Sequence, residues 1–160
     1  METYESFLNI IKSEISFGST TIHIHRPHEL EDGQLGYSLS AAGDHLIDDE
    51  AGSWQKSWLV IGYDETCGDP IFINRAEDGY PVYIAMVGKG IWNPKRIAVS
   101  LAGFAHAISA ITAIAENREY PEALERNPLA QSDKDSTLDV IRKSNPGIDI
   151  DFWETLLDES

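Results

Sequence analysis

The sequence predicts an α+β fold in which a central, largely antiparallel sheet is covered by helices. Three short apolar runs, at residues 58–61, 71–73 and 82–87, are rich in the β-branched and aromatic residues that favour strands. The connections between these runs are too short to contain a crossover helix, so the three strands must be antiparallel neighbours. The first and last runs are apolar at consecutive positions, which indicates that both faces of the sheet need cover from helices elsewhere.

The chain before this meander predicts one helix and one strand. Apolar side chains recur at intervals of three and four between residues 3 and 15, which predicts an amphipathic helix that ends at Gly18. Residues 20–25 then alternate, with isoleucines on one side and His23 and His25 on the other. Such alternation predicts a half-buried strand.

Two segments are rich in turn-forming residues. Residues 28–52 are polar and contain several glycines, and we interpret them as a loop with a short edge strand at 35–39. Residues 88–95, which include Trp92, are interpreted as a link between the meander and the next helix.

A helix is predicted after Ser100, whose side chain is placed to cap it. Its apolar stripe is Leu101, Phe104, Ile108 and Ile111. Because no other stripe is long enough to cover the meander, we expect it to face the strand residues Leu59, Val60, Ile71, Ile73 and Ile84.

The C-terminal part of the chain is acidic and partly helical. A break at 120–121 precedes a short helix at 137–143, a turn at 145–147 and a last helix at 151–157. The last helix is rich in large apolar side chains, so we expect it to dock on the core. The length of 160 residues fits one domain, which we take to span residues 1–160.

The order of elements over about residues 55–115 has a counterpart in a known family. An apolar strand and an Asp-containing loop lead to GDPIFIN at 68–74, an acidic glycine turn, PVY at 81–83 and IAVSL at 97–101, which opens a helix. This order resembles the SUKH superfamily, whose bacterial members are mostly immunity proteins that bind and neutralise a toxin. The resemblance implies a SUKH-like domain with a protein partner, and it includes no catalytic signature.

The charge of the chain is strongly negative and unevenly distributed. The formal net charge is −15, and the segments 1–50, 51–100 and 101–160 carry −8, 0 and −7. So negative a surface repels nucleic-acid phosphates and anionic membranes, and it favours cationic partners or serves solubility alone. No apolar run approaches the ~20 residues that span a bilayer, the N-terminus lacks the pattern of a secretory signal, and a single Cys67 agrees with a reducing cytoplasm.

The most metal-like pattern is formed by His23, His25 and His28. Histidines two apart on a strand point the same way, and neutral imidazole is a common zinc ligand. A metal-dependent enzyme that uses these three residues is therefore one alternative. The third histidine lies beyond Pro27, and a fourth ligand would have to come from Glu29, Glu31 or Asp32. The sequence therefore predicts surface or interface histidines, no metal and no cofactor.

No set of residues fits a catalytic template. Asp64 and Asp69 are the residues that a tight β-connection needs, because their side chains bond the local backbone. Cys67 would need a histidine base, and His106 lies on the predicted helix after Ser100. The sequence therefore predicts no catalytic residues and no enzyme.

The remaining hypothesis is protein binding through acidic groups. Residues 29–50 contain no lysine or arginine, so their acidic side chains cannot pair along the segment. We expect a non-catalytic, cytoplasmic immunity-type protein that binds a basic toxin domain, with a scaffold or regulatory protein of the same fold as the alternative. The candidate partner-binding residues are Glu29, Glu31, Asp32, Asp48, Asp49, Glu50, Asp64, Asp69 and Trp92.

Overall fold

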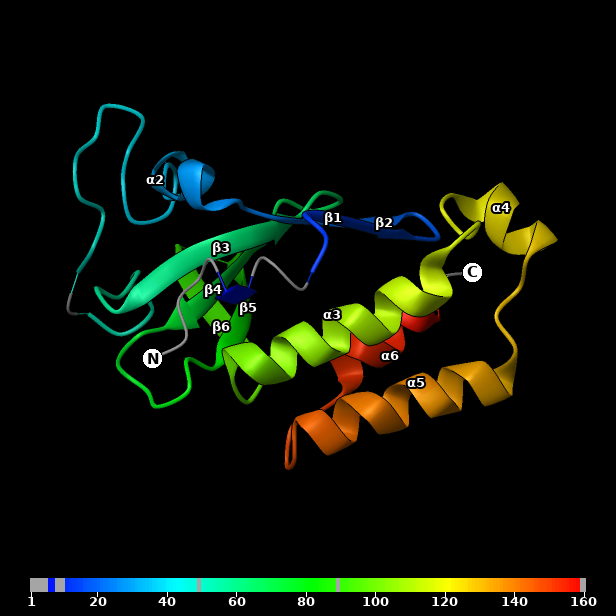
Figure 1. Cartoon of the computed structure of the whole chain (residues 1–160). Coiled ribbons are helices and arrows are strands. Elements are labelled where there is room, and N and C mark those ends of the chain that lie inside the picture. The colour runs from blue at the N-terminus through cyan, green and yellow to red at the C-terminus, as the bar shows by residue number, and fades with distance from the viewer. Residues whose placement is uncertain (1–5, 8–10, 49, 89, 159–160) are drawn as a thin grey trace.

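A computed structural model describes residues 6–7, 11–48, 50–88 and 90–158. Its centre is one six-stranded sheet in which each strand pairs antiparallel with the next, in the order β1-β2-β3-β4-β5-β6 (Figure 1). The strands are β1 (Glu14–Phe17), β2 (Thr20–Ile24), β3 (Trp58–Asp64), β4 (Pro70–Asn74), β5 (Val82–Gly88) and β6 (Ile91–Ala98). The predicted α+β fold and its antiparallel meander are confirmed.

The described helices come in two groups. Two short ones follow β2: η1 (Pro27–Glu29) and α2 (Leu30–Gly33). The others follow β6: α3 (Leu101–Ala115), α4 (Pro121–Arg126), α5 (Gln131–Ser144) and α6 (Asp151–Leu157). Helices α3, α5 and α6 lie together on one side of the sheet (Figure 1). None of the helices in the described part of the chain is long and apolar enough to cross a membrane.

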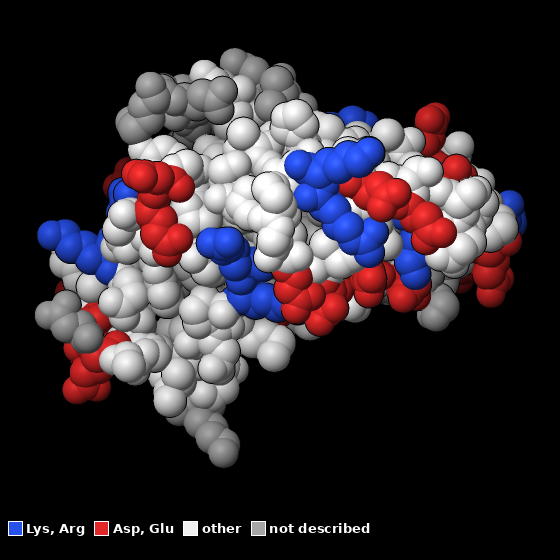
Figure 2. Space-filling model, turned by 90° about the horizontal axis from the view of Figure 1, so that it is seen from below, with Lys and Arg blue, Asp and Glu red and all other residues white. Residues whose placement is uncertain are grey.

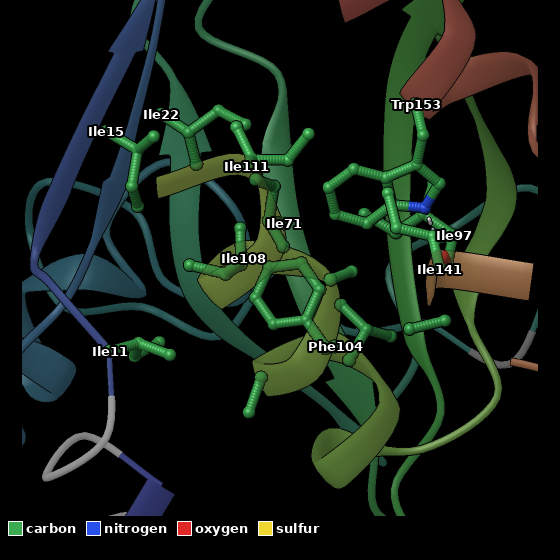
Figure 3. Close-up of a cluster of buried hydrophobic side chains, with 14 of the residues drawn as sticks. Ile11, Ile15, Ile22, Ile71, Ile97, Phe104, Ile108, Ile111, Ile141 and Trp153 are labelled. Atoms are coloured by element: carbon green, nitrogen blue, oxygen red, sulfur yellow. Dashed lines mark hydrogen bonds between the residues drawn. The ribbon is translucent and has the colours of Figure 1, made fainter. Parts of the chain in front are cut away.

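Helix α3 begins as predicted and packs on the sheet through its apolar stripe. The Ser100 hydroxyl accepts a hydrogen bond from the Gly103 amide at 2.9 Å, which satisfies one of the free N–H groups of the first turn. The stripe residues are buried in one cluster with strand side chains, and Leu59 and Ile84 pack against that cluster (Figure 3). The cluster includes Leu101, Phe104, Ile108, Ile111, Ile71 and Ile73.

The prediction that Val60 faces α3 is wrong. Successive strand residues point to opposite faces, and Ile61 takes the place on the α3 face. A register shift between Val60 and Gly62 marks a β-bulge at this point in β3. Val60 is buried instead in a second cluster with Trp54, Phe72 and Ala85, on the other face of the sheet.

The cover of that second face is not helical, which corrects the expectation that helices cover both faces. Residues 34–57 lie over it in an irregular conformation, and Trp54, Tyr37 and Ile47 from this segment belong to or pack against the second cluster. Gln34 fixes the segment to the sheet. Its amide nitrogen donates to the Val60 carbonyl at 2.9 Å and its amide oxygen accepts from the Val60 N–H at 3.0 Å.

Four predicted elements need correction. Residues 88–95 are not a link, because most of them belong to the β5–β6 hairpin; Pro94 is tolerated because β6 is an edge strand. The end of the helix predicted at 3–15 is replaced by β1, while residues 6–7 are helical and residues 8–10 lie outside the described residues. The strand predicted at 35–39 reduces to isolated bridges from Leu39. Helix α5 begins six residues before the predicted 137.

The C-terminal helices dock on the core as predicted. Trp153 of α6 is fully buried, and its indole N–H donates to the Ile97 carbonyl of β6 at 2.8 Å. Asn145, which follows α5, is buried beneath α3. It donates to the carbonyls of Gly103 and Ile141 at 3.1 and 3.0 Å and accepts from the Val99 amide at 3.0 Å. The charged tail is thereby tied to the sheet by satisfied polar groups.

Candidate functional site

The first candidate surface is the acidic segment, which we define as residues 27–57 between β2 and β3. Four of its predicted site residues, Glu31, Asp32, Asp48 and Glu50, are exposed. None of these four forms an ion pair with a Lys or Arg among the residues that the structure describes. Asp49 lies outside the described residues. These four carboxylates are therefore not paired with a Lys or Arg within the described part of the chain, and the segment itself contains a single Lys, Lys56.

The acidic residues of the C-terminal half are arranged differently. Lys95 lies 3.7 Å from Asp151, Arg142 lies 3.1 Å from Asp139, and Lys134 pairs with Asp158. Seen from below the view of Figure 1, many Lys and Arg side chains stand beside Asp and Glu (Figure 2). Some carboxylates of this half are thus locally paired with Lys or Arg, whereas the four exposed carboxylates of the acidic segment are not.

The acidic segment is held on the sheet at several points. Besides the Gln34 contacts, the Tyr37 hydroxyl donates to the Gly68 carbonyl in the β3–β4 turn at 3.2 Å. The Trp54 ring is buried and contacts the rings of Tyr37, Trp58 and Trp92 at centroid distances of 5.2–5.6 Å. The carboxylates are thus carried by a segment with a fixed, aromatic underside.

Trp92 is a contact of this underside more than a free surface residue. It is half-buried, packs on Trp54 and Tyr37, and donates its backbone N–H to the Gly52 carbonyl at 2.8 Å. Its ring therefore makes contacts within the fold, and a role in partner binding stays a prediction. It joins β6 to the acidic segment.

The turn between β3 and β4 brings Asp64 and Asp69 together. The Asp64 carboxylate accepts a hydrogen bond from the Thr66 amide at 2.8 Å, as expected for a turn residue. Burial, together with the nearby Asp64 carboxylate, raises the pKa of Asp69 above its ordinary value. Burial thus disfavours the ionised form of Asp69.

An apolar surface that the sequence analysis missed lies at the end of the β5–β6 hairpin. Met86, Val87 and Ile91, which we call the hairpin end, have exposed fractions of 63%, 58% and 47%. Gly52 of the acidic segment lies directly against the Ile91 side chain, so the two surfaces adjoin. The sequence feature that could have indicated this surface was the apolar run 82–87, which continues beyond the residues buried in the core.

The histidine pattern is only partly assembled. His23 Nε2 lies 3.2 Å from Glu29 Oε2, and His25 Nδ1 lies 3.7 Å from the same oxygen. His28 is 82% exposed and its Nε2 lies 3.9 Å from the other oxygen of Glu29. The carboxylate of Glu29, predicted as a partner-binding residue, thus stands in the place that the sequence analysis gave to His28.

The electrostatics of this cluster follow from its burial. Burial lowers the pKa of His25, and the neighbouring His23 lowers it further against the opposing effect of Glu29. His23 stacks on the Tyr63 ring at a centroid distance of 5.1 Å. Cys67 and His106 are both exposed, and no hydrogen bond joins them among the described residues.

Comparisons with known proteins give no further guide. No protein-family model, no curated protein and no solved structure matches this chain. The resemblance to the SUKH superfamily therefore stays a prediction from the sequence.

Proposed function

We propose that this chain is a non-catalytic protein-binding module of the immunity type, which acts in the cytoplasm by binding and neutralising a toxin with a basic surface. The observation that carries the proposal is the acidic segment. Its exposed carboxylates have no Lys or Arg partner among the described residues, and they stand on a segment fixed to the sheet by Gln34 and Trp54.

The partner that fits this surface is a cationic protein domain. Opposite charges raise the association rate by steering the encounter, and stable complexes also need an apolar area that is dehydrated on binding. The hairpin end adjoins the acidic segment and supplies such an area. A nuclease toxin would offer its cationic substrate groove as the complement, and blocking that groove would neutralise it.

The test uses two charge variants with the same change in net charge. The segment variant is Glu31→Gln, Asp32→Asn, Asp48→Asn and Glu50→Gln, and the control variant is Glu116→Gln, Glu122→Gln, Glu125→Gln and Asp135→Asn. All eight carboxylates are exposed. Immobilised wild-type protein, segment variant and control variant are each exposed to lysate of the source cells, and the retained proteins are identified by mass spectrometry.

We expect a basic protein that is retained by the wild type and by the control variant but lost from the segment variant. Expression of that protein alone should arrest growth, and coexpression of the wild-type chain should restore it. A partner that is retained equally by all three baits, or one that is harmless when expressed alone, contradicts the proposal. The second result would favour a scaffold or regulatory role.

A further inference from the structure

We propose that His23, His25 and Glu29 form a binding site for a divalent first-row transition metal, with Zn²⁺ as the expected ion. Their ligand atoms all lie within 4.8 Å of one another. The proposal does not rest on the proposed toxin binding, although Glu29 belongs to the acidic segment. The expectation of no metal rested on the position of His28 beyond Pro27 and on the missing fourth ligand; in the structure Glu29, one of the residues considered for that ligand, lies beside His23 and His25 while His28 is exposed.

The distances suit a tetrahedral ion. Zinc binds imidazole nitrogen and carboxylate oxygen at about 2.0–2.2 Å, so neighbouring ligand atoms of a tetrahedral site lie about 3.3–3.5 Å apart. Glu29 Oε2 is 3.2 Å from His23 Nε2 and 3.7 Å from His25 Nδ1. Shifts of a few tenths of an ångström would bring these two contacts to the ideal separation.

The three side chains are held in place by their own elements. His23 lies in β2 and His25 directly follows the last residue of that strand; the two residues lie two apart along extended chain, and their ring centroids are 5.3 Å apart. Glu29 Oε1 accepts from the Arg26 amide at 3.3 Å, an arrangement that turns Oε2 toward the imidazoles. The His25 ring lies against Gly33, where the space of a Cβ atom would overlap it. Ligands on regular elements with such supports need little rearrangement on binding.

The ligand set also indicates which ions bind. Two imidazoles and one carboxylate suit Zn²⁺, Co²⁺, Ni²⁺ and Fe²⁺, whereas Ca²⁺ and Mg²⁺ require mostly oxygen ligands. Glu29 and His23 are both partly exposed, with side-chain exposures of 34% and 20%, so water or another small ligand can complete the coordination. Three protein ligands with one open position are the arrangement found in catalytic zinc sites.

A competing grouping shares one residue with this site. Glu14, His23 and Glu65 also place their ligand atoms within 4.8 Å of one another. It offers one imidazole and two exposed or partly exposed carboxylates, which is a weaker set for Zn²⁺. The variants must therefore separate Glu29 from Glu65.

The experiment titrates the untagged full chain, stripped with a chelator and desalted, with Co²⁺ and then with Zn²⁺. Co²⁺ binding is followed by its visible absorption, and Zn²⁺ binding by competition with a chromophoric chelator. The variants are Glu29→Gln and His23→Gln at the site, Glu65→Gln at the competing grouping, and His28→Ala and His106→Gln as controls. Circular dichroism establishes that each variant is folded, and His25 is left unchanged because it is buried.

We expect each chain to bind one equivalent of Co²⁺, which Zn²⁺ then displaces. Glu29→Gln and His23→Gln should each weaken binding at least tenfold, while Glu65→Gln, His28→Ala and His106→Gln leave it unchanged. Zn²⁺ should raise the Tm of the wild type and not that of Glu29→Gln. The proposal is overturned if the wild type binds no equivalent, if His28→Ala weakens binding as much as Glu29→Gln, or if Glu65→Gln weakens it and Glu29→Gln does not.

Discussion

At Gly103, the side chain of Asn145 occupies the space that a Cβ atom would need. An added Cβ would overlap Asn145 Oδ1 and lie 2.9 Å from the Ser144 carbonyl oxygen. Asn145 cannot move away without losing its hydrogen bonds to Val99, Gly103 and Ile141. This contact of α3 with the end of α5 is therefore specific to glycine.

We expect Gly103→Ala to destabilise the fold by about 1–3 kcal/mol, the usual cost of overpacking. Helix propensity alone would favour alanine by about 1 kcal/mol, so the sign of the change separates the two effects. Urea unfolding measures it, with Ala102→Gly at the exposed neighbouring position as the control for propensity. An increase in stability for Gly103→Ala would show that Asn145 does not fill this space.

Asp69 gives a prediction with a defined pH dependence. Its pKa is raised, so the folded state binds the proton more tightly than the unfolded state, and stability falls as pH rises through that pKa. We expect Asp69→Asn to be more stable than the wild type at pH 7. The gain should shrink as the pH is lowered toward about 4, the ordinary range of an Asp carboxyl, where protonation neutralises the wild-type side chain too.

Denaturant unfolding at several pH values measures this difference. Asp78→Asn, at an exposed position in the next turn, is the control for the same substitution without burial. If the gain in stability of Asp69→Asn did not depend on pH, its cause would not be the loss of the negative charge.

At the residue scale, the sequence predicted that His23 and His25 share a face, and it offered Glu29 only as one of three possible ligands beside His28. The alternation of a strand is local and can be counted. The position of Glu29 depends on the 3-10 helix that begins at Pro27, and the position of the His25 ring depends on its packing against Gly33.

Among the elements, β3 depends on a side chain from outside the sheet. Beyond the pairing of β2 with β3, the backbone groups of Val60 have no strand neighbour on the β2 side and bond the Gln34 amide instead. Gln34 thus extends the pairing by one residue and fixes the acidic segment to the sheet.

We expect Gln34→Ala to cost about 2–4 kcal/mol, because it leaves two buried backbone groups of Val60 unsatisfied. Gln131→Ala, at an exposed position on α5, should change stability by less than about 0.5 kcal/mol. Chemical denaturation of both variants makes the comparison. Equal, small effects would show that Val60 is hydrated without Gln34.

Helix α3 contributes several buried side chains to the main apolar cluster. Phe104 is fully buried, with its ring 5.9 Å from that of Phe7 and 6.1 Å from that of Trp153. We expect Phe104→Ala to lower the free energy of unfolding by about 3–5 kcal/mol, because it removes a buried ring and leaves a cavity. A shift below about 1 kcal/mol in chemical denaturation would contradict this assignment.

The elements that could be predicted are those with strong periodicity. The meander, α3 and α6 have it, and the structure confirms them. The missed strand β6 follows Gly90 and contains Asn93 and Pro94, residues typical of turns, and it forms because an edge strand tolerates them beside β5. The four residues of β1 continue the apolar spacing of the preceding residues, so the sequence alone could not distinguish this strand from the end of a helix.

At the scale of the whole molecule, the sequence revealed how the charged residues are distributed along the chain but not which of them form ion pairs. The sequence analysis found two acidic flanks of similar net charge. Only the structure separates them, because the ion pairs described for Lys and Arg involve residues 95–158. The position of the hairpin end beside the acidic segment likewise depends on long-range pairing of strands.

The association rate with the captured partner, measured at two ionic strengths, tests the central proposal most directly. Exposed charges steer association over a range of about 8–10 Å that salt shortens, and they contribute little to folding. We expect the segment variant defined above to associate more slowly at low salt and to lose most of its salt dependence, while its stability stays close to that of the wild type. The control variant should keep most of the wild-type rate and salt slope. An unchanged association rate and salt slope in the segment variant would contradict the proposed role of the acidic segment. Its carboxylates would then serve only the solubility of the protein.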